Sequence, residues 1–177
     1  MPGKSGVAIR IPLPPSLAAV REAGEPSARM GIPPHVTVLY PFVPAAELTP
    51  AVRSALAGIA ADHRPFVATM GPPEIRDDMV WLVPRDQGPF LRLTASVHAR
   101  WPEHPPYGGT HPDLIAHLLV IQTADRLERE AARAAAMRVC PFHAAVTELE
   151  VLTEDDEGRW RLRWRLPLGS PAPDGGS

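Results

Sequence analysis

The chain has 177 residues, 45% of them hydrophobic and 21% charged, so it is long enough to bury a core and has a globular composition. Its formal net charge of -2 gives no reason to expect a protein coated in nucleic acid. The single cysteine, Cys140, excludes an internal disulfide framework and a cysteine-based zinc site. Prolines interrupt the brief apolar run near the N-terminus, so we expect neither a signal peptide nor a membrane span. We therefore expect a cytoplasmic protein.

Hydrophobic periodicity predicts strands and helices through the first half of the chain. Thr49 and Pro50 stand at the N-cap and first helical positions of one predicted helix. In chain order, we expect a strand over 5–13, a helix over 15–24, a strand over 34–42, a helix over 48–63, and short strands over 66–70, 73–76 and 79–83.

The second half repeats this order of elements. We expect a helix over 88–102, a loop of His, Pro and Gly, a strand over 117–123, a helix over 125–138, and a hairpin of strands over 141–152 and 158–168. The tail, residues 170–177, is small, polar and rich in Pro and Gly, which predicts disorder.

Two segments match each other in order, one from each half. Each opens with a histidine, at His35 or His117, and continues through a helix, a strand led by Pro-Phe and a hairpin ending in a Trp-x-x-Pro or Trp-x-Leu-Pro sequence. A duplicated β-α-β-β unit is therefore predicted, with halves of about 25–100 and 110–169 inside one bilobal domain over 1–169. If the halves pack about a pseudo-twofold axis, the two histidines face each other.

The strand at residues 34–42, PHVTVLYPF, combines an imidazole and a hydroxyl. Because side chains alternate along a strand, His35 and Thr37 point to one side, while Val36, Val38 and Tyr40 point to the other. We therefore expect Tyr40 to pack inward and His35 to share its face with Thr37.

The segment PPHVTVLYPF, followed by a histidine-led strand after a GGTHPD loop, resembles the 2H phosphoesterase superfamily, in particular its 2′-5′ RNA ligase-like members. The resemblance covers residues 5–168. It implies an α+β bilobal 2H phosphoesterase-like fold of duplicated β-α-β-β units, with two mostly antiparallel sheets around a central groove and helices outside. It also implies a His-x-Thr or His-x-Ser motif on each of two facing strands.

By this resemblance, His35 and His117 are the catalytic acid and base, and Thr37 binds the scissile phosphate. The second motif differs from the pattern, because Leu119 stands where a hydroxyl residue is expected. Leu119 would then contact the substrate in place of that hydroxyl, with reduced or altered activity. Two imidazoles on opposite sides of a phosphate can take and give protons without a metal or another cofactor.

Two further residues are candidates for substrate binding. The strand RWRLRWRL places Arg159, Arg161, Arg163 and Arg165 on one predicted face, where Arg163 could hold a phosphate, although charged edge strands also serve solubility. Tyr107 precedes the second motif, in a loop with Gly108 and Gly109, and could stack on a base or cover the groove. The alternative for both residues is an ordinary exposed position.

The expected activity is cleavage of a 2′,3′-cyclic phosphate or a 2′-5′ phosphodiester in a nucleotide or an RNA end, by a monomer that binds neither DNA nor membrane. One alternative is a binding module that holds a nucleotide or RNA terminus without turnover. Another is an enzyme of the same fold that uses its histidines on a less anionic small molecule, which Leu119 would suit. The spacing of His104 and His111 is poor for a metal site, so no metal is expected.

Overall fold

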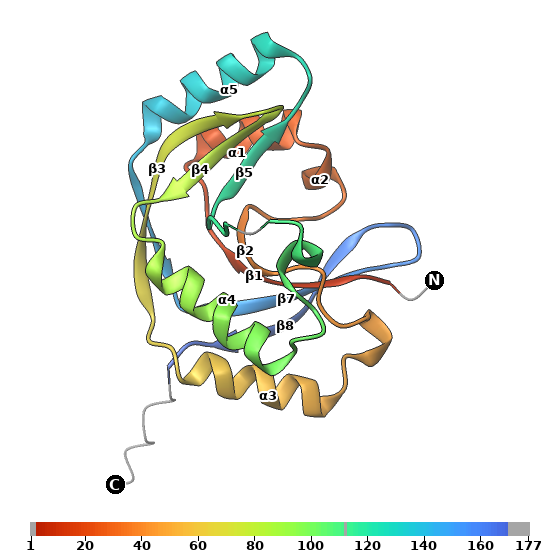
Figure 1. The fold of residues 1–177 in the computed structure, drawn as a ribbon. Helices are drawn as coiled ribbons and strands as arrows, with labels where there is room; N and C mark the ends of the chain where they lie inside the picture. The colour runs from red at the N-terminus through yellow and green to blue at the C-terminus, as the bar shows by residue number, and fades with distance from the viewer. Residues whose placement is uncertain (1–2, 112, 170–177) are drawn as a thin grey trace, which may run out of the picture.

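The computed structural model describes residues 3–111 and 113–169, so the predicted disordered tail over 170–177 lies outside the described residues. The elements follow one another along the ribbon of Figure 1. They are β1 (Ser5–Arg10), α1 (Pro15–Gly24), α2 (Pro26–Arg29), β2 (His35–Leu39), η1 (Ala45–Glu47), α3 (Pro50–Ala61), β3 (Phe66–Arg76), β4 (Met79–Pro84), α4 (Gly88–Arg100), η2 (Pro106–Gly109), β5 (Leu118–Gln122), α5 (Arg126–Val139), β6 (Phe142–Val146), β7 (Glu148–Glu154) and β8 (Trp160–Pro167).

The strands form one antiparallel sheet in the order β6-β3-β4-β5-β2-β1-β7-β8, which curls around a central opening (Figure 1). The α+β prediction with antiparallel strands is confirmed. The predicted pair of sheets is a single sheet instead, because β2 pairs with β5 where Val36 lies opposite Leu118. Four strands lie on each side of this junction, and we call these two groups the lobes.

Each lobe takes strands from both halves of the chain. The β3–β4 hairpin joins β5 and β6, whereas β7 and β8 join β1 and β2. The predicted strand over 141–152 is interrupted at Thr147, where the chain passes from β6, paired with β3, to β7, paired with β1. The lobes are therefore interlaced and do not correspond to the contiguous halves about 25–100 and 110–169.

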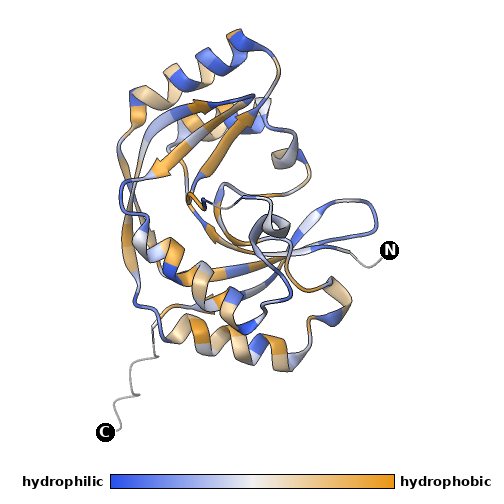
Figure 2. Cartoon of the chain, viewed as in Figure 1, coloured by the Kyte–Doolittle hydropathy of each residue, from blue (hydrophilic) through white to orange (hydrophobic). Residues whose placement is uncertain are grey.

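The helices cover the outer face of the sheet. Helices α1 and α5 pack against β5 and its neighbours, while α3 packs against β8 and α4 against β2. Val36 and Val38 are buried on this side, and the Thr94 hydroxyl of α4 donates to the Val38 carbonyl at 2.8 Å. Figure 2 shows α5 with many hydrophilic residues and β4 and β5 as largely hydrophobic. Groups that alternate with the buried valines are thus left facing the central opening.

Side-chain caps fix the starts of two helices. Thr49 accepts a hydrogen bond from the Val52 amide at the start of α3, as its position predicts, and Asp125 accepts from two amides at the start of α5. None of the helices in the described part of the chain has both the length and the apolar character to cross a membrane.

Candidate active site

The first histidine lies at the start of β2 with its ring held by two hydrogen bonds. Its Nδ1 atom lies 2.8 Å from the carbonyl oxygen of Pro33. A carbonyl can only accept, so Nδ1 carries the proton, and Nε2 is free to accept from the Thr37 hydroxyl at 3.2 Å. His35 and Thr37 therefore share one face of the strand, as the alternation predicts.

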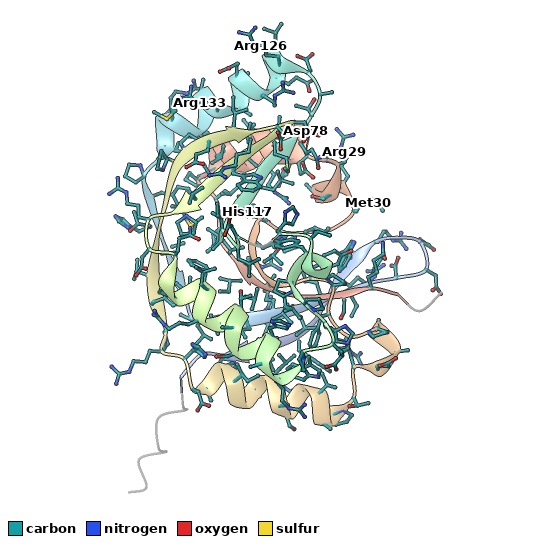
Figure 3. All side chains as sticks on the ribbon, viewed as in Figure 1. Arg29, Met30, Asp78, His117, Arg126 and Arg133 are labelled. Atoms are coloured by element: carbon teal, nitrogen blue, oxygen red, sulfur yellow. The ribbon has the colours of Figure 1, made fainter. Side chains whose placement is uncertain are left out.

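The second histidine is fixed in the same way. His117 immediately precedes β5, and its Nδ1 atom lies 2.8 Å from the carbonyl oxygen of Ile115, again two residues earlier in the chain. Its ring stacks on the indole of Trp81, with centroids 3.7 Å apart and planes at 12°. Figure 3 shows His117 pointing into the central opening, whereas Arg126 and Arg133 lie on the outer side of α5. In both histidines, Nε2 is the nitrogen left for chemistry.

The pairing of β2 with β5 brings the two motifs together. Because Val36 lies opposite Leu118 in an antiparallel pair, Thr37 comes next to His117 and Leu119 next to His35. The two histidines are then diagonal neighbours, and such positions are typically about 7–8 Å apart. They are close enough for a charge on His117 to act on the pKa of His35.

Burial favours the neutral form of both imidazoles. It lowers the pKa of His35 to about 4. The Arg21 charge and protonation of His117 lower this pKa further, whereas the bond to Pro33 and the Glu150 carboxylate raise it. Burial also lowers the pKa of His117, with smaller contributions from Arg76 and His111. An anion bound between the rings would favour their protonated forms.

A hollow of about 310 Å³ adjoins His35 and is mostly apolar. Ile32, Tyr40 and Trp160 contribute to its lining, and the rings of Tyr40 and Trp160 lie 6.0 Å apart. The expectation that Tyr40 packs inward is wrong, because β1 has a register shift between Val7 and Ala8 that changes the pairing beyond Thr37. Tyr40 instead contacts the groove side of the sheet near Gly6.

A second hollow, of about 380 Å³, adjoins His117 and is also mostly apolar, with charged side chains in its lining. Its lining includes Arg76, Trp81 and Tyr107. The Arg76 guanidinium binds one carboxylate oxygen of Glu74 through two nitrogens, at 2.8 and 3.0 Å, and lies 5.2 Å from the centre of the Trp81 ring. This hollow therefore supplies a positioned cation and an aromatic face beside the second histidine.

Tyr107 comes from the loop that precedes the second motif and reaches both motifs. Its ring lies 6.4 Å from that of His117 with the planes at 20°, and it lines a small hollow together with Thr37. Its backbone amide donates to the Tyr40 carbonyl at 2.7 Å. The structure thus brings Tyr107 together with Thr37 and His117.

Leu119 is half-buried and its backbone makes the more specific contact. The Arg21 Nε atom lies 3.3 Å from the Leu119 carbonyl, and another guanidinium nitrogen lies 3.0 Å from the Ile32 carbonyl. Arg21 is 4% exposed and comes from α1, on the outer face of the sheet. It bridges β5 and the segment that leads into β2.

Arg163 is not brought to the histidines. It is exposed on β8, with its guanidinium 5.8 Å from the ring of Trp164, and it lines neither hollow. A register shift between Val151 and Leu152 makes β8 bulge at this point, so Trp160 and Leu162 pair on the groove side instead of sharing the face of Trp164. The predicted arginine face is therefore broken, and Trp160 occupies the groove wall.

Sequence reasoning missed the roles of Arg76, Trp81 and Trp160 in lining the hollows. Local patterns carry no signal for these three, because their positions depend on pairing between distant strands. Elsewhere, His63 lies 3.0 Å from the Ser96 hydroxyl and His143 lies 3.0 Å from that of Thr69. No group of three or more His, Cys, Asp or Glu side chains within residues 3–111 and 113–169 is arranged to hold a metal.

Comparisons with known proteins show the family and the fold of the chain. The sequence profile of the 2′-5′ RNA ligase superfamily matches residues 10–158. The fold is similar to a crystal structure described as a phosphoesterase, at 19% identity and a TM-score of 0.58 over 96% of this chain and 100% of that one. It is also similar to E. coli LigT complexed with 3′-AMP, at 20% identity and 0.56 over 96% and 100%.

A protein of Thermus thermophilus gives 20% identity and a TM-score of 0.60 over 95% and 100% of the two chains. These likenesses to solved structures establish the shared fold. Among curated protein sequences, the comparison finds no match.

Proposed function

Since the chain belongs to the 2′-5′ RNA ligase superfamily, we propose that it is a metal-independent phosphoesterase acting on a 2′,3′-cyclic phosphate or a 2′-5′ phosphodiester of a nucleotide or RNA end. The observation that carries the proposal is the matched pair of histidines. His35 and His117 both donate from Nδ1 to the carbonyl two residues earlier, which leaves both Nε2 atoms for acid-base chemistry across one groove.

The two histidines divide the proton transfers. In hydrolysis of a cyclic phosphate, the neutral Nε2 atom of His35 takes a proton from the attacking water as the new P–O bond forms. His117, protonated once the anionic substrate is bound, gives its proton to the ribose oxygen as the P–O bond to that oxygen breaks. The product is a phosphomonoester. The low pKa of His35, about 4, supports its assignment as the base at neutral pH.

The remaining groups bind the substrate. The Thr37 hydroxyl donates to a phosphoryl oxygen, where charge increases during the reaction, and Arg76 adds a positive charge on the His117 side. The aromatic side chains of the two hollows offer faces for bases. LigT crystal structures hold 3′-AMP and NADP+, which supports nucleotides as the ligand class. Under this proposal, the protein acts as a monomer in the cytoplasm.

The test is hydrolysis of 2′,3′-cyclic mononucleotides and short 2′-5′-linked oligonucleotides in EDTA, with wild type, His35→Ala and His117→Ala. We expect turnover that survives EDTA and falls by about 100-fold or more in each variant, since general acid-base catalysis contributes about 10²–10⁴-fold. His143→Ala, at an exposed strand position, is the matched control and keeps full activity. Turnover that is lost in EDTA, or kept in both groove variants, would refute the proposal.

One observation favours a second candidate, the enzyme that acts on a less anionic small molecule. The hollow beside His35 is lined mainly by apolar groups, and Leu119 stands next to that histidine. If a folded wild-type protein hydrolyses none of the phosphodiesters, neutral aromatic compounds should raise its melting temperature, and Trp160→Ala should abolish that rise. A nucleotide-binding module without turnover would instead be stabilised by nucleoside monophosphates.

A further inference from the structure

The two motifs supply different groups to the middle of the groove. Thr37 places a hydroxyl next to His117, whereas the symmetric position, Leu119, places an apolar side chain next to His35. A phosphate bound between two imidazoles has several oxygens that require donors as charge develops on them. The two strands therefore provide one hydroxyl donor, Thr37, although the two motifs have two equivalent positions, 37 and 119.

The phenol of Tyr107 is a further hydroxyl on the His117 side of the groove. Tyr107 and Thr37 line the same small hollow, and the Tyr107 ring lies 6.4 Å from that of His117. The Thr37 hydroxyl gives its proton to His35 Nε2 at 3.2 Å. An incoming phosphate oxygen could accept the phenol proton of Tyr107.

The loop holds Tyr107 in an unusual conformation. Its φ angle of +51° falls in the left-handed region, which a tyrosine rarely adopts and which surrounding contacts must maintain. The amide donates to the Tyr40 carbonyl at 2.7 Å, and the Thr110 hydroxyl donates to the Tyr107 carbonyl at 2.7 Å. A side chain fixed this way is preorganised for a defined role.

The phenol remains a donor at neutral pH. Burial raises the pKa of Tyr107 above its usual value, and the neighbouring Thr37 side chain offsets only part of that rise. A protonated phenol has one O–H to give, and a phosphate oxygen can only accept.

We propose that Tyr107 is a phosphate-binding residue that supplies, from the loop before β5, the second hydroxyl donor that position 119 lacks. This inference rests on the proposed phosphoesterase function. It assigns the phenol a hydrogen bond to a phosphoryl oxygen. If Tyr107 instead stacked on a base, its hydroxyl would not be required, and a phenylalanine at this position would serve equally well.

The experiment is a double-mutant cycle on kcat/KM for 2′,3′-cyclic nucleotides. Tyr107→Phe keeps the ring and removes the donor, so we expect a loss of about 10- to 1000-fold, the range found for single oxyanion donors. Leu119→Thr in wild type should change the rate less than about threefold, because the donor is already present. In the Tyr107→Phe background, it should restore at least about tenfold.

The control is Thr69→Val, which removes a hydroxyl that bonds His143 away from the groove and should leave the rate unchanged. A Tyr107→Phe variant within about threefold of wild type would overturn the proposal. So would a Leu119→Thr effect that is equal in both backgrounds.

Failure of the proposed function is distinguishable from failure of this inference. If wild type shows no turnover, binding of inorganic phosphate is measured by calorimetry in wild type and Tyr107→Phe. Affinity weaker by about tenfold in the variant would support the phenol as a phosphate donor even without hydrolysis. Equal affinity in the two proteins, or no phosphate binding by wild type, would overturn it.

Discussion

At the scale of single residues, His35 and His117 make the same Nδ1 hydrogen bond to a backbone carbonyl, but their surroundings differ. His35 accepts from Thr37, whereas His117 stacks on Trp81 beside the hollow that Arg76 also lines. Pairs of titratable groups whose surroundings separate their pKa values are the usual basis for an acid and a base in one site. The pKa of His35, near 4, keeps this imidazole neutral as the pH falls into the mildly acidic range.

That low pKa predicts acid sensitivity of the fold. Between the ordinary value of 6.5 and about 4, the unfolded chain binds a proton at position 35 and the folded protein does not. The free energy of unfolding therefore decreases as the pH falls through this interval, by up to about 3 kcal/mol from this group. Urea denaturation at pH 7 and pH 4.5 should show a smaller decrease in His35→Gln than in wild type.

The control for this prediction is His143→Gln, at an exposed position on β6. It should keep the wild-type dependence on pH. An identical decrease in wild type and His35→Gln would show that the buried imidazole is not the group that resists protonation.

At the scale of elements, local sequence predicted most boundaries and missed the irregularities. Helix α1 begins at Pro15 as predicted, and α3 begins after the Thr49 cap. The bulges in β1 and β7–β8 were not predictable, because the hydrogen-bonding ladder between distant strands decides where one residue is added. Each bulge reverses the faces beyond it, which explains why Tyr40 and Trp160 line a hollow that alternation assigned to other residues.

The residues of the candidate site were likewise predictable from local sequence only in part. His35, Thr37 and His117 were identifiable because each lies in a short motif on a strand, and the sheet brings them together. Arg76 and Trp81 were not identifiable, because their place beside His117 follows from the pairing of β4 with β3 and β5. Catalytic roles for the three motif residues remain predictions.

Two glycines should respond oppositely to alanine. Gly31 has φ +88°, and an added Cβ would lie 2.5 Å from the Trp160 carbonyl oxygen, so Gly31→Ala should destabilise the fold by about 1–3 kcal/mol. Gly58 lies in α3 with open space around its Cβ position, so Gly58→Ala should stabilise it by about 0.5–1 kcal/mol. Urea midpoints that move in the same direction would contradict the assigned contact between the Gly31 loop and β8.

At the scale of the whole molecule, the groove lies across the junction of the two lobes. Strands β2 and β5 are joined where Val36 meets Leu118, and Arg21 bridges the Leu119 and Ile32 carbonyls beside that pair. The interlaced hairpins make each lobe depend on both halves of the chain. The distance between the two histidines is therefore set by a few contacts at this junction, among which the buried Arg21 carries a positive charge.

Replacing Arg21 should thus change the chemistry of His35 as well as the junction. Burial is the largest cause of the low pKa of His35, and the Arg21 charge lowers it further, so Arg21→Met should raise that pKa toward its ordinary value. The two carbonyls also lose a donor, at about 1–3 kcal/mol for each one left unsatisfied. An NMR titration of the His35 ring protons measures the first effect independently of the second.

Arg126→Met, on the outer side of α5 in Figure 3, is the matched control and should leave the titration unchanged. An unshifted His35 titration in a folded Arg21→Met protein would mean that the Arg21 charge does not affect the pKa of His35. Burial alone would then keep this imidazole neutral.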